Sequence, residues 1–179
     1  GKSMPAQRMP TIMPGMSDDE ALPTAALNSI IGQSVDLTNW RKRPFRNPHH
    51  TCSAVALVGG SSNPKPGEIS LAHNGVLFLD ELPEFERKVL DSLREPMETG
   101  TVTISRAARQ MEFPAQFQLI AALNPSPTGC HNDKRATPDQ VMRYLSRVSG
   151  PFIDRIDLQI ELPRLSSAQL QSTQEEQSS

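Results

Sequence analysis

Residues 76–79, Val-Leu-Phe-Leu, constrain the fold of this chain more than any other segment. An apolar run without polar alternation is typical of a strand buried on both faces, as strands are in a parallel sheet. Asp80 and Glu81 follow at once, where such a strand would leave the core. Two adjacent carboxylates in that place are costly unless they have a task. The segment therefore predicts an α/β fold with a functional pair of acids at a strand end.

Nucleotide hydrolysis is the common task of such a pair. The aspartate then holds Mg²⁺ and the glutamate activates a water molecule, as in a Walker B motif. The chain also starts with Gly1-Lys2-Ser3, which match the last three positions of the phosphate-binding loop G-x-x-x-x-G-K-[ST]. In that loop the lysine reaches the β- and γ-phosphates, and the hydroxyl coordinates Mg²⁺. The two segments predict ATP and Mg²⁺ as cofactors, with Ser3 and Asp80 as metal ligands.

Plainer explanations exist for both segments. Gly-Lys-Ser is a frequent tripeptide and can be an ordinary amino terminus, and acidic residues also favour the start of a solvated helix. Asn124 ends the second apolar run, where an amide can orient the attacking water, although an Asn-Pro turn explains it equally well. The two apolar runs and the Gly-Lys-Ser start favour the nucleotide site when they are taken together.

Composition limits the other classes of function. A chain of 179 residues suffices for one domain with a substantial core. The formal net charge of −2 shows no basic bias, so nucleic-acid binding would depend on a local patch. Two cysteines far apart give no disulfide framework and fit a reducing cytoplasm. No apolar run approaches the roughly 18 residues of a membrane span, and no leader pattern is present. We expect an excised fragment whose native start lies upstream.

The remaining patterns predict the other elements. Two alternating segments, 101–104 and 110–113, indicate a β-hairpin, and 117–123 indicates a second buried strand. A third strand is expected at 156–160, an irregular polar region over 32–53, and a flexible loop or hairpin tip over 59–67. One helix is expected over 1–13, ended by Pro10 and Pro14, and a second from a capping box at 17–20 to about residue 30. Further helices are expected over 53–58, 84–98 and 138–145.

Several arginines are candidates for binding anions. Arg155 could stabilise phosphoryl charge in a neighbouring subunit, or it could pair with Asp154 or Asp157. Arg147 is the reserve candidate for that role. Arg106 and Arg109 occupy the predicted hairpin tip and could grip a DNA backbone, although a solvated turn is commoner. The basic run 41–46 invites the same hypothesis.

A zinc site is the remaining possibility from residue types. His49, His50 and Cys52 are close in sequence, and Cys130-His131 form another pair. A structural zinc site needs four ligands at closed spacing, and no C-x-x-C is present. The pattern therefore argues against zinc.

Several segments together resemble the magnesium-chelatase-like AAA+ ATPases of bacteria, of the ComM/YifB type. The resemblance covers about residues 1–163 and is carried by segments 44–51, 63–81, 104–107, 122–127 and 145–155. It implies an α/β fold, an αβα sandwich of the P-loop AAA+ type with a helix-2 insert and a pre-sensor-1 β-hairpin. Residues 164–179 fall outside it, and their Ser, Gln and Glu content predicts a disordered tail.

The resemblance also implies roles. Lys2 and Ser3 would belong to Walker A, Asp80 and Glu81 to Walker B, Asn124 would be sensor 1, and Arg155 the arginine finger in trans. It implies a ring, a hexamer in the ComM type, linked to DNA branch migration during natural transformation, with the hairpin in a DNA channel. By the resemblance, we expect the first part of Walker A, a Lon-like domain and the lid with its sensor 2 arginine to lie outside this sequence. Two alternatives stay open: a chelatase motor subunit, which drives metal insertion into a porphyrin, and a folded module without catalysis.

Overall fold

A three-stranded parallel sheet organises the fold in the computed structural model, which describes residues 2–34, 36–60, 64–106, 109–126 and 136–162. Its strands are β1 (Phe45–Arg46), β2 (Val76–Leu79) and β5 (Gln118–Ala121), in the order β1-β2-β5. Phe45 pairs with Val76, and Val76 pairs with Gln118. The four residues of β2 are fully buried between the neighbouring strands and both faces. This confirms the α/β fold and the central, doubly buried strand.

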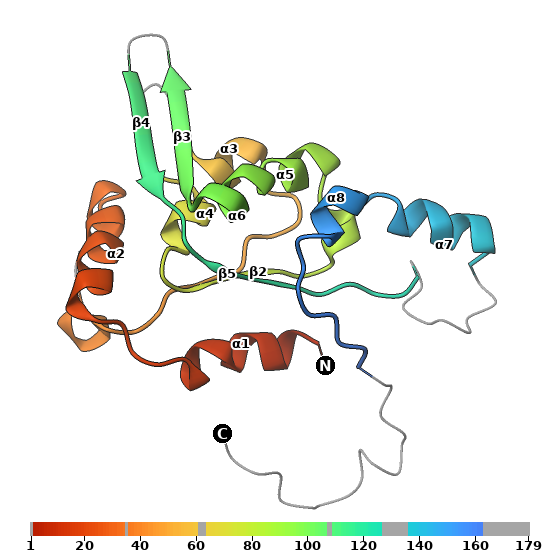
Figure 1. Cartoon of the computed structure of the whole chain (residues 1–179), viewed down its shortest axis with the longest axis horizontal. Coiled ribbons are helices and arrows are strands. Elements are labelled where there is room, and N and C mark those ends of the chain that lie inside the picture. The colour runs from red at the N-terminus through yellow and green to blue at the C-terminus, as the bar shows by residue number, and fades with distance from the viewer. Residues whose placement is uncertain (1, 35, 61–63, 107–108, 127–135, 163–179) are drawn as a thin grey trace, which may run out of the picture.

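Helices cover both faces of the sheet, giving three layers (Figure 1). On one face lies α1 (Ser3–Ile12), whose buried Ala6 packs with Phe78 and Ala122. On the other face lie α3 (Ala54–Val58), α4 (Glu68–Leu71), α5 (Arg87–Asp91) and α6 (Arg94–Thr99). Successive strand residues point to opposite faces, so Leu77 and Leu79 join the larger core on this second side.

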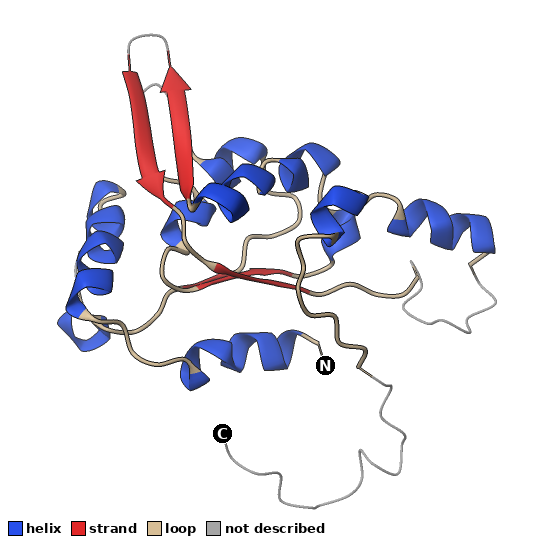
Figure 2. Cartoon of the chain, in the orientation of Figure 1, coloured by secondary structure: helices blue, strands red, loops and turns tan. Residues whose placement is uncertain are grey.

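The hairpin projects from this body. Its strands are β3 (Thr101–Arg106) and β4 (Arg109–Pro114), antiparallel, and Figure 2 shows their far ends standing clear of the helices. Val102, Ile104 and Phe113 are buried in the main core, whereas Thr103 and Ser105 are exposed. This alternation anchors the base of the hairpin and confirms its prediction from sequence.

Three helices stand outside this arrangement. α2 (Asp18–Ile30) begins with the predicted capping box between Ser17 and Glu20, in which both reciprocal hydrogen bonds form. A 3₁₀ turn, η1 (Leu37–Asn39), follows it. α7 (Pro138–Leu145) has the predicted bounds and also starts with a capping box, and α8 (Gly150–Ile153) is one short turn after it.

Prolines bear on two of the predicted helices. The helix expected over 1–13 is confirmed as α1, which contains Pro10 and ends at Ile12, because only two residues follow that proline and the lost hydrogen bond is confined to the last turn. The single helix expected over 84–98 is divided into η2 (Leu82–Glu84), α5 and α6. Phe85 and Glu86 are extended after η2, and Pro96 has no N–H with which to continue α5 into α6.

The expected third strand is also wrong. Residues 156–160 have no regular structure, and Leu158 and Ile160 are each 80% exposed. The third strand is instead β1, which lies in the region that was expected to be irregular. Two residues are too few to show a period of two, so their sequence carries no strand signal. The buried strand expected over 117–123 is confirmed, with the shorter bounds of β5.

Candidate nucleotide site

The candidate site lies where β2, β5 and the start of α1 meet. β2 and β5 are parallel, so their carboxyl ends reach the same edge of the sheet. Asp80 and Glu81 follow β2, and Asn124 comes three residues after the end of β5. Lys2 and Ser3 stand at the amino end of α1, on the face beneath (Figure 1). Three segments that are far apart in sequence therefore supply the site.

Two side-chain contacts join these segments. Lys2 Nζ donates to Asn124 Oδ1 at 2.5 Å, and Ser3 Oγ donates to Asp80 Oδ2 at 2.6 Å. The other oxygen of Asp80 accepts the backbone N–H of Glu81 at 3.0 Å. The structure thus brings together four of the residues that the sequence singled out. Gly1 lies outside the described residues.

This donor set fits a hard divalent cation. Mg²⁺ prefers oxygen ligands, and a hydroxyl beside a carboxylate supplies two of them. The first N–H groups of a helix have no partner within the helix, and Lys2 adds a positive charge at the start of α1. Both features suit an anionic phosphate. The arrangement can therefore hold a phosphate and a metal ion side by side.

Glu81 has an unusual backbone conformation. Its φ is 54° and its ψ 48°, in the left-handed region that non-glycine residues rarely occupy. The turn places its side chain at the surface, 52% exposed, next to His50 in the loop after β1. His50 Nδ1 lies 3.3 Å from Glu81 Oε2. From the sequence, His50 was a candidate only as a zinc ligand. The closeness of His50 to Glu81 follows from the pairing of β1 with β2, which the sequence did not predict.

Tyr144 is a second residue of the site that the sequence analysis missed. It is buried on α7. Burial raises the pKa of the Tyr144 hydroxyl and the charges of Glu84 and Glu81 act in the same direction, whereas the backbone of Asn124 acts against them. Tyr144 thus lies beside the segment after β5 that carries Asn124. It is the single tyrosine of the chain, which was the available signal.

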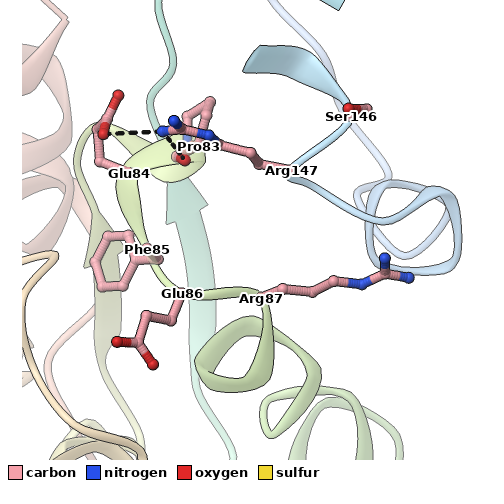
Figure 3. Close-up of a pocket in the computed structure, with 7 residues that line it drawn as sticks. All are labelled: Pro83, Glu84, Phe85, Glu86, Arg87, Ser146 and Arg147. Carbon is pink, nitrogen blue, oxygen red and sulfur yellow. Dashed lines mark hydrogen bonds and ion pairs between the residues drawn. The ribbon is translucent and has the colours of Figure 1, made fainter. Parts of the chain in front are cut away.

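Arg147 closes a hollow beside the Glu81 turn (Figure 3). It donates to the Glu84 carboxylate at 3.1 Å and to the Pro83 carbonyl at 3.4 Å, and its guanidinium lies 6.0 Å from the Tyr144 ring centre. The reserve candidate for a trans-acting arginine thus has partners within its own chain. The residues that line the hollow are Pro83, Glu84, Phe85, Glu86, Arg87, Ser146 and Arg147.

Arg155 is not joined to the four-residue cluster. It pairs with Glu98 on α6 and donates to the Pro151 carbonyl. The alternative expected from the sequence was an ion pair of Arg155 with Asp154 or Asp157. An ion pair within the chain is present, but its partner is Glu98, so the expected partners are wrong. Its side chain is 27% exposed at the surface.

The basic run 41–46 is engaged in ion pairs within the chain. Arg41 pairs with Asp18, Arg43 with Glu20, and Arg46 with Glu68 through two hydrogen bonds. Glu68 raises the pKa of Arg46. Because three of its cations already have carboxylate partners, this run does not form a free anion-binding patch. Arg106 and Arg109 are backbone partners in the last described register of the hairpin, whose far end projects away from the sheet (Figure 1).

A zinc centre has no support in the described part of the chain. Those residues contain no group of three or more histidine, cysteine or acidic side chains arranged for a metal ion. His49 contacts Thr51, and burial raises the pKa of the Cys52 thiol, which disfavours the thiolate a metal needs. Cys130 and His131 lie outside the described residues. Among the described helices, none is long and apolar enough to cross a membrane.

Fold and site together define an α/β protein of the P-loop class, with a Lys-Ser pair at a helix start facing an aspartate at a strand end. Comparison with known families agrees. The family described as magnesium chelatase, subunit ChlI, matches residues 1–170, and the chain belongs to this AAA+ family.

Relatives refine the family assignment. The chain is 58% identical over 177 residues to the competence protein ComM of Haemophilus influenzae, covering 97% of this chain and 34% of that protein. It is 56% identical over 165 residues to YifB of Escherichia coli, covering 91% and 33%. An uncharacterised protein of Mycobacterium tuberculosis is 41% identical over 169 residues, covering 92% and 34%. These matches confirm the ComM/YifB-type resemblance. The chain spans about a third of the length of these relatives.

Proposed function

We propose that residues 1–163 form the ATP-binding and ATP-hydrolysing core of an AAA+ motor. The observation that carries this proposal is the pair of contacts Lys2–Asn124 and Ser3–Asp80. They gather, at one edge of a parallel sheet, the residue types that bind a phosphate and its metal ion. The hairpin and the segment before β2 would be the pre-sensor-1 hairpin and the helix-2 insert of this core. The proposed disordered tail, 164–179, lies outside the described residues.

The proposed roles follow from the chemistry of each group. Lys2 would hold the β- and γ-phosphates after exchanging its bond to Asn124 for a phosphate oxygen. Ser3 and Asp80 would hold Mg²⁺, which neutralises phosphate charge when bound. Glu81 would polarise the attacking water, and Asn124 would orient it. Gly1 would add a backbone N–H to the phosphate cradle.

Arg155 would act in a neighbouring subunit. An arginine supplied in trans stabilises the charge that develops on the transferred phosphoryl group. In this chain Arg155 is paired with Glu98, so it would exchange that partner for the nucleotide when subunits assemble. This role requires a ring, and we propose a homohexamer for the full-length protein, in the cytoplasm.

Glu81→Gln in the full-length protein tests the catalytic assignment. We expect ATP hydrolysis to fall by about 100-fold or more, because an amide cannot take a proton from water. ATP affinity, measured with a fluorescent analogue, should change less than threefold, since Lys2, Ser3 and Asp80 remain. Lys2→Ala is the matched variant that should lose ATP binding itself. Hydrolysis that survives Glu81→Gln would show that the assignment is wrong.

DNA remodelling is the proposed work of the motor. The hairpin stands clear of the body, and Arg106 and Arg109 are backbone partners in its last described register. A projecting pair of cations can contact a phosphate backbone. Similarity to a protein named for competence favours a DNA substrate over a porphyrin. Branch migration during natural transformation is the specific activity that we propose.

Salt-dependent binding of branched DNA tests the proposed contact between the hairpin and DNA. The double variant Arg106→Ala with Arg109→Ala should weaken DNA binding. It should also reduce the slope of log K against log salt by about two, since each phosphate contact releases roughly one counterion. Lys42→Ala, in the basic run near the α2 side, is the control and should bind as the wild type does. Unchanged affinity in the double variant would remove the hairpin from the DNA interface.

A chelatase motor subunit is the second candidate function. The family match itself carries that description, and the same site would serve it. In that case ATP hydrolysis would respond to a porphyrin partner and not to DNA. A folded module without catalysis is the third candidate, and the absence of hydrolysis in the full-length protein would favour it.

A further inference from the structure

His50 contacts the carboxylate that the proposed mechanism assigns to water activation. Its Nδ1 atom lies 3.3 Å from Oε2 of Glu81. Within the described part of the chain, no other side chain forms an ion pair with Glu81. The contact is not a chance meeting of surface side chains, because β1 and β2 are hydrogen-bonded in parallel and their following loops leave the same edge of the sheet.

The surroundings of His50 hold its ring in one place. Its centre lies 4.1 Å from that of the His49 ring, and 6.4 Å from that of Phe85, which it meets edge to face. Phe85 is 2% exposed and belongs to the main core. The backbone on both sides is also restrained, since the Cys52 N–H donates to the His49 carbonyl and Ser53 caps α3. The His50 side chain, 29% exposed, is therefore a supported group facing a half-exposed carboxylate.

Glu81 needs such a partner. Its backbone conformation sets the direction of its first side-chain bond, but the glutamate side chain keeps further rotatable bonds and is half exposed. A carboxylate that acts on water must be held in a defined direction, because misplacement by about 1 Å costs on the order of 100-fold in rate. An imidazole carries an N–H at Nδ1 when protonated and also in one neutral tautomer, so it can hold a carboxylate oxygen in either state.

We propose that His50 is a positioning residue for Glu81 that restricts the carboxylate to the direction needed for hydrolysis. The proposal rests on the proposed ATPase function. Among the described residues, His50 forms no ion pair or hydrogen bond with Lys2, Ser3 or Asp80, so it acts through Glu81. Its removal should lower kcat and leave the affinity for ATP unchanged.

The test measures steady-state ATP hydrolysis and ATP affinity in the full-length protein. His50→Ala should lower kcat by about tenfold, the usual effect of removing a group that orients a functional ligand, with KM within twofold. His50→Asn places an amide N–H near the position of Nδ1 and should recover most of the loss. His49→Ala, which removes the neighbouring imidazole that does not pair with Glu81, is the matched control and should keep more than half of kcat.

A double-mutant comparison separates positioning from folding. In a Glu81→Gln background, His50→Ala should not reduce the residual single-turnover rate further, because the group that it orients is already gone. Equal losses in both backgrounds, a rise in kcat, or a His49→Ala loss equal to that of His50→Ala would overturn the proposal. If the wild type hydrolyses ATP and Glu81→Gln keeps only the small residual rate expected, these results bear on His50 alone. A wild type without ATPase activity would overturn the proposed function and this proposal with it.

Discussion

The two ends of β2 carry the same rare backbone conformation for different reasons. Asn74, just before the strand, has φ 61°, and Glu81, just after it, has φ 54°. At the first end the backbone N–H, the backbone carbonyl and the side-chain NH₂ of Asn74 all have structural partners. Its side chain donates to the Glu20 carbonyl at 3.0 Å, its N–H donates to the Gln116 carbonyl at 2.7 Å, and its own carbonyl accepts from Arg43 at 2.7 Å.

The second end has no such set of bonds. Asparagine tolerates the left-handed region because its short side chain bonds locally, whereas glutamate has no such advantage. The Glu81 carboxylate is half exposed and meets only a histidine from the neighbouring loop within the described part of the chain. The strain at the first end is thus offset by hydrogen bonds that fasten α2 and β4–β5 to the strand. At the second end the backbone of Glu81 bonds only within its own turn, to Asp80 and Glu84. No bond to another element offsets its strain, as is typical of functional sites.

The largest expected effect on stability is at the first end. Asn74→Ala removes the side-chain bonds and puts a residue with a Cβ but no local bonding into the left-handed region. We expect the free energy of unfolding to fall by about 2–3 kcal/mol, from about 1 kcal/mol per hydrogen bond and at least 1 kcal/mol of backbone strain. Urea unfolding measures it. Asn74→Gly loses the same bonds without the strain, and should be about 1 kcal/mol more stable than the alanine variant. Equal stabilities would contradict the strain at this position.

The second end should respond in the opposite direction when each glycine variant is compared with the wild type. Asn74→Gly loses its side-chain bonds and should be less stable than the wild type. Glu81→Gly relieves the backbone strain and loses no bond to another element, so it should be more stable than the wild type and about 1 kcal/mol more stable than Glu81→Ala. Both variants should lose ATP hydrolysis. Thermal unfolding of the two variants side by side provides the measurement. A glycine variant less stable than the alanine variant would mean that the turn after β2 is not strained, and the contrast between the two strand ends would disappear.

The smallest expected effect is a pH dependence at the first end. Burial lowers the pKa of His73, opposed by the nearby Glu20 charge, and the ring accepts the Gln116 N–H at Nδ1, 3.1 Å away. The unfolded chain therefore binds a proton more readily than the folded one. The stability that this provides is present above the ordinary histidine value of 6.5 and is lost as the pH falls through the lower folded pKa. Unfolding measured across this range should show that slope.

His73→Asn is the matched variant for this prediction. Its side-chain oxygen can accept the same N–H, but it does not titrate, so the slope below pH 6.5 should flatten while the bond is kept. A slope that persists in this variant would assign the pH dependence to other groups.

Local patterns predicted much of the fold. The doubly buried β2, the alternating hairpin strands and the Ser17 capping box were all visible because their signals lie within a few adjacent residues. Lys2, Ser3, Asp80 and Asn124 could be named for the same reason, since each stands at a recognisable boundary of a helix or strand. β1 could not be predicted, because two residues show no periodicity. The division of the helix expected over 84–98 could not be predicted either, because whether a proline interrupts a helix depends on its three-dimensional context.

Partners of charged residues form the other class of errors. Arg41, Arg43 and Arg46 looked like one basic patch, yet each meets its own carboxylate from a distant segment. Arg155 pairs with Glu98, 57 positions away, and not with the aspartates beside it. Nothing in the neighbourhood of these arginines indicates the partner, because packing of whole elements decides it.

By itself the sequence determined the buried strand, the acids that follow it and the Lys-Ser pair that they face, because burial and boundary signals are encoded locally. Only the tertiary structure decided that β1 lies beside β2 and that His50 thereby reaches Glu81. It likewise decided that Tyr144 lies beside the chain at Asn124. These contacts join segments 20 or more residues apart, and the packing of a complete sheet edge brings them together, which no short stretch of residues specifies.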